Sequence, residues 1–181
     1  VDWVVILLYL LLVIGGAISI YAASYDFDNA SIFSFDEFSG KQIRWIGFSF
    51  VLGFILLLID KRMYETYAYP IYFAIVVLLM VTIVIAPNIK GSHSWLVLGP
   101  MSLQPAEFGK FATALALAKL FSGYNFNLNA KKTNYVKAIA IIGLPIILIL
   151  AQNETGSALV YLSLMFVLYR EGMSGLVLFA F

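Results

Sequence analysis

The feature that most constrains this chain is a stretch of 23 residues, from Trp3 to Tyr25, that contains no charged side chain. As an α-helix this stretch would extend about 34 Å, enough to cross a bilayer hydrocarbon core of roughly 30 Å. The apolar core of a secretory signal peptide is shorter, about 7–15 residues. We therefore expect a retained membrane span.

The composition excludes a water-soluble domain. Hydrophobic residues make up 62% of the chain and charged residues 12%, against roughly 45–50% and about 25% in soluble domains. The mean hydropathy is +0.96. With no cysteine and a net charge of +1, the chain has no disulfide framework, no thiol nucleophile and no basic patch for nucleic acid.

Further apolar stretches indicate an all-α, polytopic transmembrane helix bundle. We expect spans over residues 43–59, 67–86, 105–121, 136–151 and 156–169, and the start of a seventh over 175–181. Pro70 is expected in the first turn of the third span, Pro87 at its end and Pro105 at the start of the fourth, where a missing N–H costs little.

Residues 1–181 are expected to form a single transmembrane domain. Because the seventh apolar run is cut off after seven residues, and backbone groups cannot stay unpaired in lipid, we expect a C-terminally truncated fragment.

The placement of basic residues predicts the orientation. Seven of the eleven Lys and Arg residues flank the connections after the second, fourth and sixth spans: Lys61, Arg62, Lys119, Lys131, Lys132, Lys137 and Arg170. By the positive-inside rule the N-terminus is cytoplasmic, and residues 26–40, 88–104 and 152–155 face outward. The first of these outer connections is acidic and aromatic, and either a strip in the headgroup layer or a solvated loop fits it.

Two ionisable residues interrupt the fourth span. Glu107 and Lys110 are three positions apart and share a helix face. Ionisable groups within spans are costly and therefore candidates for function. They could converge on a polar ligand or form a buried ion pair that holds two helices in register, and the sequence leaves both open.

A second polar interruption covers residues 152–157, QNETGS. It could be a tight turn, but Gln152 and Glu154 place hydrogen-bonding groups at a depth where an unpaired one costs several kcal/mol. The single histidine, His93, excludes a His-based metal site or triad, and we expect it on the surface. Trp95 is expected to be an interfacial anchor, and Tyr72 and its neighbouring tyrosines an aromatic belt.

These segments resemble the RodA/FtsW (SEDS) family. Residues 91–110, GSHSWLVLGPMSLQPAEFGK, are similar to its signature: a Gly-x-x-Arg-Trp segment, then Gln-Pro-Ser/Ala-Glu and a Lys three residues after the Glu. Residues 152–158 look like its Gln-Pro-Asp-Leu-Gly-Thr-Ala, and Asp2-Trp3 with residues 21–24 resembles its opening helix. The motif positions are Trp95, Gly99, Gln104, Pro105 and Gly156.

The chain departs from the motifs at three positions. Ser94 stands where many members have Arg, so a phosphate contact of that Arg does not carry over. Asn153 replaces the Pro. Glu154 replaces the Asp, which keeps the charge and adds one methylene.

The resemblance, closer to the RodA branch, implies a peptidoglycan glycosyltransferase of cell-wall elongation and cell shape in the bacterial cytoplasmic membrane. It would polymerise lipid II, a polyprenyl-diphosphate-linked disaccharide peptide, with a class B penicillin-binding protein as partner. The family has about ten spans, and its presumed catalytic Asp lies in an outer loop after the seventh. No catalytic residue is therefore expected before Phe181.

The same resemblance implies substrate-binding roles for Glu107, Lys110, Gln152 and Glu154. A cationic group or a metal ion must stabilise the departing diphosphate; no cofactor is evident, and a divalent cation stays open. Lys110 would meet the diphosphate, Glu107 would hold Lys110, and Gln152 and Glu154 would shape the cavity. A lipid II flippase and a membrane scaffold that recruits cell-wall enzymes are the alternatives.

Overall fold

The computed structural model describes residues 3–23, 38–89, 91–99, 101–123, 132–173 and 175. The chain forms two compact units, Val1–Asp60 and Lys61–Phe181, and each is described by itself. The acidic connection over 26–37, the motif residue Asp2 and most of the seventh apolar run lie outside the described residues. The prediction of one domain over 1–181 stays a prediction.

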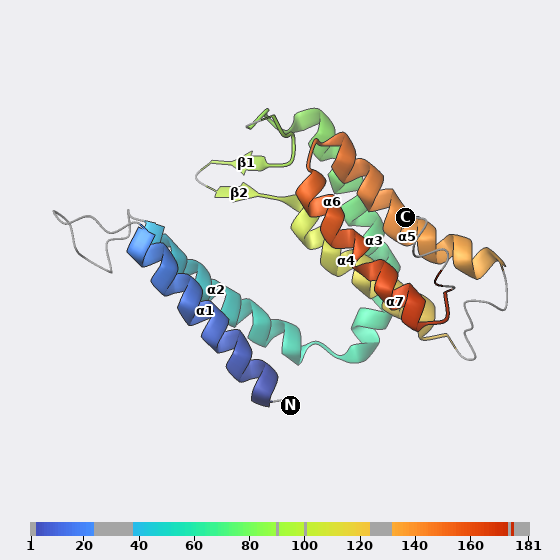
Figure 1. Ribbon diagram of the computed structural model, residues 1–181, viewed down its shortest axis with the longest axis horizontal. Coiled ribbons are helices and arrows are strands. Elements are labelled where there is room, and N and C mark those ends of the chain that lie inside the picture. The colour runs from blue at the N-terminus through green and yellow to red at the C-terminus, as the bar shows by residue number, and fades with distance from the viewer. Residues whose placement is uncertain are drawn as a thin grey trace. The chain divides into compact units, whose positions relative to one another are not determined.

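The first unit is a pair of helices, α1 (Trp3–Ala23) and α2 (Phe38–Leu58), which pack side by side (Figure 1). The rings of Tyr9 and Phe50 meet edge to face, with centroids 6.1 Å apart. No residue of α1 is buried. A helix that is apolar all round and buries none of its residues has a surface suited to lipid.

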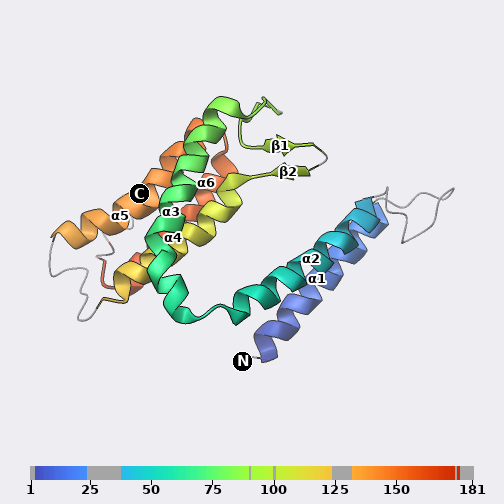
Figure 2. The same cartoon turned by 180° about the vertical axis from the view of Figure 1, so that it is seen from behind.

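The second unit contains α3 (Lys61–Ile85), α4 (Pro105–Phe121), α5 (Lys132–Ala151), α6 (Thr155–Leu162) and α7 (Leu164–Arg170). The helices α3, α4, α5 and α6 lie against one another, as both views show (Figures 1 and 2). In both views α3 and α5 end at the same end of the unit at which α4 and α6 begin.

The connection between α3 and α4 contains a short β-hairpin that was not predicted from the sequence. β1 (Leu96–Leu98) pairs with β2 (Met101–Leu103) in antiparallel register, Leu96 opposite Leu103. Gly99 opens the turn with a φ of +63°, a conformation that costs other residues energy. We call this end of the second unit, where α3 and α5 end and α4 and α6 begin, the hairpin end.

Two clusters of buried side chains form the core of the second unit. One lies nearer the hairpin end: Leu79, Ala106, Ile149, Ala158 and Tyr161. The other consists of Leu117, Ala138, Ile142, Met165, Leu168 and Met173. The Tyr161 hydroxyl donates to the Ala106 carbonyl at 2.9 Å and lies where a Cβ on Gly109 would clash with it. A glycine at 109 therefore permits the close approach of α6 to α4.

The prediction of an all-α, multi-pass membrane fold is confirmed in its main part. Among the described residues four helices are long and apolar enough to cross a membrane: Trp3–Ala23, Gly40–Leu58, Lys61–Ile85 and Thr133–Ala151. The stretch expected as a sixth span is two helices, because α6 ends at Leu162 and α7 begins at Leu164. The Ser163 hydroxyl between them donates to the Val160 carbonyl at 2.6 Å.

The predicted position of Pro70 was wrong. α3 begins at Lys61, so Pro70 lies inside the helix and not in its first turn. The residues before the apolar run, among them Lys61, Arg62 and Glu65, are good helix formers, so the helix starts two turns early. Pro105 is at the first position of α4, and α3 ends at Ile85, two residues before Pro87, as predicted.

A second internal proline explains a bond between helices. Pro145 in α5 has no N–H, so the Ile141 carbonyl four residues earlier lacks its usual helical donor. The Tyr72 hydroxyl of α3 donates to that carbonyl at 3.0 Å. The sequence placed Tyr72 in an aromatic belt, whereas the structure gives it an interhelical hydrogen bond of the kind that joins helices in membranes.

Candidate functional site at the hairpin end

The Glu154 carboxylate collects hydrogen bonds from three separate segments of the chain. Oε2 accepts from the hydroxyls of Ser92 at 2.8 Å and Ser94 at 3.0 Å. Oε1 accepts from Nε2 of Gln104 at 3.1 Å and, at a longer 3.5 Å, from the Ser157 hydroxyl. We call these five residues, Ser92, Ser94, Gln104, Glu154 and Ser157, the Glu154 cluster.

The local structure explains why these side chains meet. Ser92 and Ser94 are two apart on an extended segment, so their hydroxyls point to one side. Gln104 and Glu154 occupy the positions just before α4 and α6. Ser157 lies one turn into α6, three residues after Glu154, and therefore on the same side.

The Glu154 cluster is electrostatically unusual because its donors are neutral. No described lysine, arginine or histidine forms an ion pair with Glu154. Ser94 is fully buried, and Glu154 is half-buried. With both oxygens already accepting hydrogen bonds, the carboxylate acts as a fixed acceptor that holds the surrounding segments in place.

The turn before Glu154 has the geometry of a Schellman motif. The N–H of Glu154 bonds the Ile149 carbonyl at 3.2 Å and that of Asn153 bonds the Leu150 carbonyl at 3.0 Å. Asn153 has a φ of +59°, the left-handed conformation that such a turn requires and that asparagine tolerates. A proline, the residue in the family motif at this position, cannot adopt that φ.

Gln152 is fully buried but does not face the Glu154 carboxylate. Its Nε2 donates to the Leu79 carbonyl of α3 at 3.0 Å, and its Oε1 has no partner among the described residues. The Gln152 carbonyl accepts from the His93 N–H at 3.0 Å, and it lies 3.2 Å from the Ser92 hydroxyl, whose single proton it shares with the nearer Glu154 carboxylate. Gln152 thus fastens the end of α5 to α3 and to the loop after α3.

His93 is half-buried, not on the surface as expected. Its Nδ1 lies 3.0 Å from the Ala86 carbonyl, which can only accept, so Nδ1 carries the proton. Nε2 then accepts from the Asn88 side-chain amide at 3.4 Å. The histidine closes the loop that follows α3 and presents no free ring nitrogen for chemistry.

Glu107 and Lys110 form an ion pair, one of the two arrangements that their spacing left open. Nζ of Lys110 lies 2.7 Å from Oε1 of Glu107, with side-chain exposures of 28% and 54%. Within the part of the chain that the structure describes, neither side chain forms a hydrogen bond or ion pair with a second helix, which favours a pair within α4 over one that holds two helices in register. Among the described residues no side-chain hydrogen bond or ion pair joins it to the Glu154 cluster, and the one link is the Glu107 N–H, which donates to the Gln104 carbonyl at 3.1 Å. The four predicted substrate-binding residues therefore form two separate groups.

The remaining motif residues have structural roles where the structure assigns one. Gly99 opens the hairpin, Pro105 starts α4 and Gln104 belongs to the Glu154 cluster. Trp95 is half-buried beside the buried Ser94. Nothing in the structure explains a glycine at 156, where a Cβ would meet open space.

The sequence did not identify Ser92 and Ser157 as site residues. The only available signals were the two-residue spacing of Ser92 and Ser94 and the three-residue spacing of Glu154 and Ser157, and neither connects one segment to the other. No group of three or more His, Cys, Asp or Glu that could hold a metal ion occurs among the residues that the structure describes.

Comparison of the sequence and the fold with known proteins identifies the family of this chain. The sequence profile of the cell cycle proteins FtsW, RodA and SpoVE matches residues 2–181. Stage V sporulation protein E of Bacillus subtilis (strain 168) is 26% identical over 168 residues, which cover 88% of this chain and 44% of that protein. The peptidoglycan glycosyltransferase MrdB of Escherichia coli (strain K12) is 32% identical over 135 residues, 74% of this chain and 36% of MrdB.

Solved structures agree with the sequence matches. The crystal structure of the rod shape determining protein RodA of Thermus thermophilus superimposes with a TM-score of 0.83 at 29% identity, covering 99% of this chain and 57% of RodA. A chain of a peptidoglycan synthase complex gives a TM-score of 0.81 at 28% identity, covering 99% and 50%. The chain thus spans less than two thirds of the length of these relatives. It belongs to the SEDS family of cell cycle proteins, with FtsW, RodA and SpoVE.

Proposed function

We propose that the protein containing this chain is a peptidoglycan glycosyltransferase that polymerises lipid II during cell-wall elongation. The observation that carries the proposal is the Glu154 cluster, which joins the two family motifs of the chain at one end of a RodA-like fold. The relative MrdB is a peptidoglycan glycosyltransferase, and the chain covers 36% of it.

In this proposal the hairpin end faces the outside of the bacterial cytoplasmic membrane and the N-terminus is cytoplasmic. The basic residues Lys61, Lys119 and Arg170, at the opposite helix ends, support that orientation. α4 serves as the fourth span, and α6 together with α7 serves as the sixth. The 17 residues of α4 and the stretch Thr155–Arg170 would each extend about 25 Å as helices.

Lys110 is proposed to stabilise the departing diphosphate. Glycosyl transfer breaks the bond between the anomeric carbon and the diphosphate, which leaves with the bonding electrons, while the acceptor hydroxyl bonds that carbon and gives its proton to a base. Lys110 lies about 8 Å from the start of α4, is mostly buried and is oriented by Glu107 at 2.7 Å. A cation so placed would offset the negative charge that develops on the leaving group.

The Glu154 cluster is proposed to position α4 for this step. Four donors already occupy the Glu154 carboxylate, so it is poorly suited to take a proton from substrate. Holding Gln104 fixes the first turn of α4 and hence the depth of Lys110. The general base is expected in a loop beyond Phe181.

A class B penicillin-binding protein is the proposed partner. The similarity to a chain of a synthase complex in which polymerization and crosslinking are coordinated supports it. Such a partner would crosslink the glycan that the polymerase extends.

The test is polymerisation of purified lipid II by the whole protein with its penicillin-binding partner, read as glycan strands on a gel. We expect strands from the wild type, none from Lys110→Met and wild-type amounts from Lys137→Met, which removes an exposed cation at the other end of the unit. Residues 1–181 alone are expected to make none. Translocation of lipid II across vesicles without strands would instead indicate a flippase, and neither activity a scaffold.

A further inference from the structure

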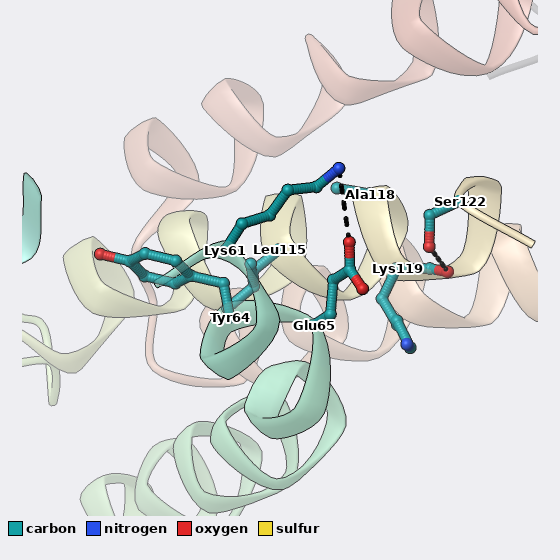
Figure 3. A pocket seen from close by; sticks show the side chains of 7 residues that line it. All are labelled: Lys61, Tyr64, Glu65, Leu115, Ala118, Lys119 and Ser122. Carbon is teal, nitrogen blue, oxygen red and sulfur yellow. Dashed lines mark hydrogen bonds and ion pairs between the residues drawn. The ribbon is translucent and has the colours of Figure 1, made fainter. Parts of the chain in front are cut away.

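A pocket opens at the end of the second unit opposite the hairpin end. It lies between the first turns of α3 and the last turns of α4 and has a volume of about 230 Å³ (Figure 3). Its lining comes from both helices: Lys61, Tyr64, Glu65, Leu115, Ala118, Lys119 and Ser122. No residue of the Glu154 cluster or of the Glu107–Lys110 pair lines it.

The lining combines an apolar wall with charges at the rim. Leu115, Ala118 and the ring of Tyr64 provide apolar surface, whereas Lys61, Glu65 and Lys119 carry charge. Both helices meet the edge of the membrane here, because α3 begins at Lys61 and α4 ends at Phe121. A molecule that fills the pocket must therefore have an apolar part and a polar part at membrane-surface depth.

The charges favour an anion. Lys61 and Glu65 form an exposed ion pair at 3.5 Å, in which the Lys61 side chain is 90% exposed, so the pair is weak and Lys61 is easily redirected. The Lys119 ammonium has no ion pair or hydrogen bond to any described residue. Lys61 also lies at the N-terminus of α3, where the helix dipole attracts negative charge.

The sequence that follows the pocket contains little negative charge to offset these lysines. Between Ser122 and Arg170 the only acidic residue is Glu154, which lies at the hairpin end. Glu65 is the one acid in the pocket, and its charge is offset by Lys61.

We propose that this pocket binds the phosphate headgroup of an anionic membrane lipid. The phosphate contacts Lys119 and Lys61, and the upper part of an acyl chain packs on Leu115 and Ala118. Basic pockets between spanning helices take such headgroups at the membrane surface. The proposal rests on the membrane location of the fold and not on the glycosyltransferase activity.

The test uses the whole protein in nanodiscs of phosphatidylcholine with phosphatidylglycerol, and native mass spectrometry counts the phosphatidylglycerol that each molecule retains. We expect Lys119→Gln to lower retention about fivefold. Glu65→Gln should raise it, because it removes the one negative charge and releases Lys61. Lys137→Gln, which removes an exposed lysine of α5 outside the pocket, is the matched control and should leave retention unchanged.

These outcomes distinguish a specific lipid-binding site from general electrostatic attraction between basic residues and anionic lipid. Equal losses from Lys119→Gln and Lys137→Gln, or equal retention of both lipids by the wild type, would overturn the proposal. Lower phosphatidylglycerol retention by Glu65→Gln would also overturn it. If Lys119→Gln fails to fold, the retention measured for Glu65→Gln tests the proposal. Free glycerol phosphate at millimolar concentration should not displace the lipid; full displacement would mean that the site binds free phosphate, and the lipid assignment would be wrong.

Discussion

The side-chain amide of Gln104 donates to the carboxylate of Glu154 across 3.1 Å, although the two residues are 50 positions apart. Gln104 precedes α4 and Glu154 precedes α6, so one hydrogen bond joins the starts of two helices. Each residue also belongs to a different motif of the SEDS family. A change at either residue should therefore disturb both helices.

The charge of Glu154 should matter more than its length. Glu154→Gln puts an NH₂ group among donors that need an acceptor, and hydrogen bonds to a charged group contribute about 1.5–3 kcal/mol. We expect loss of function in the whole protein and a lower melting temperature in detergent. Glu154→Asp keeps the carboxylate and should retain function. A functional Gln variant would show that the residue is only a turn element.

Substitutions at Lys110 and Glu107 test whether the positive charge of Lys110 binds a ligand or only stabilises the helix. If Lys110 meets a diphosphate, the double reversal Glu107→Lys with Lys110→Glu restores the ion pair but puts the wrong charge at the ligand. We expect lipid II polymerisation to stay abolished in the reversed protein while its melting temperature stays near wild type. Restored polymerisation would favour a purely structural pair.

Tyr72 and Pro145 should be energetically coupled through the Ile141 carbonyl. Tyr72→Phe removes the donor and leaves a carbonyl unpaired within the bundle, at a cost of about 1–3 kcal/mol. In a Pro145→Ala background the new N–H bonds that carbonyl, so the same change should cost less. A double-mutant cycle on unfolding in detergent measures the difference. Equal costs in both backgrounds would contradict this account.

Asn153 should accept glycine and reject proline. Its φ of +59° and its N–H bond to the Leu150 carbonyl are both impossible for proline. Asn153→Gly should fold and run as a single peak in size-exclusion chromatography, whereas Asn153→Pro should lose folded material. A well-folded Pro variant would mean that the turn can take the form suggested by the family motif.

The proposed orientation predicts how added cysteines are labelled. In a cysteine-free background, a cysteine at Val97 of the exposed hairpin should react with a membrane-impermeant thiol reagent added to intact cells. One at the exposed Asp60, between α2 and α3, should react only after the cells are opened. The reverse pattern would invert the topology.

Local sequence determined the elements of this protein that depend on near neighbours. The long apolar runs identify α1, α2, α3 and α5, because the hydrophobic length needed to cross a bilayer is a property of one segment. The three-residue spacing of Glu107 and Lys110 placed them on one helix face within reach of each other, since a helix fixes that geometry, although it left open whether they pair. Pro105 marked the start of α4 for the same local reason.

Tertiary structure decided what depends on distant segments. Ser94 and Glu154 are both departures from the family motifs, and nothing in their spacing of 60 residues indicates that they touch. The fold brings the Ser94 hydroxyl to 3.0 Å from the carboxylate. In that arrangement the longer Glu154 side chain accepts a hydrogen bond from the shorter Ser94 side chain. The Tyr72 bond likewise follows from the packing of α3 on α5. Such contacts require helices to be placed in three dimensions, which hydropathy and spacing along one chain do not specify.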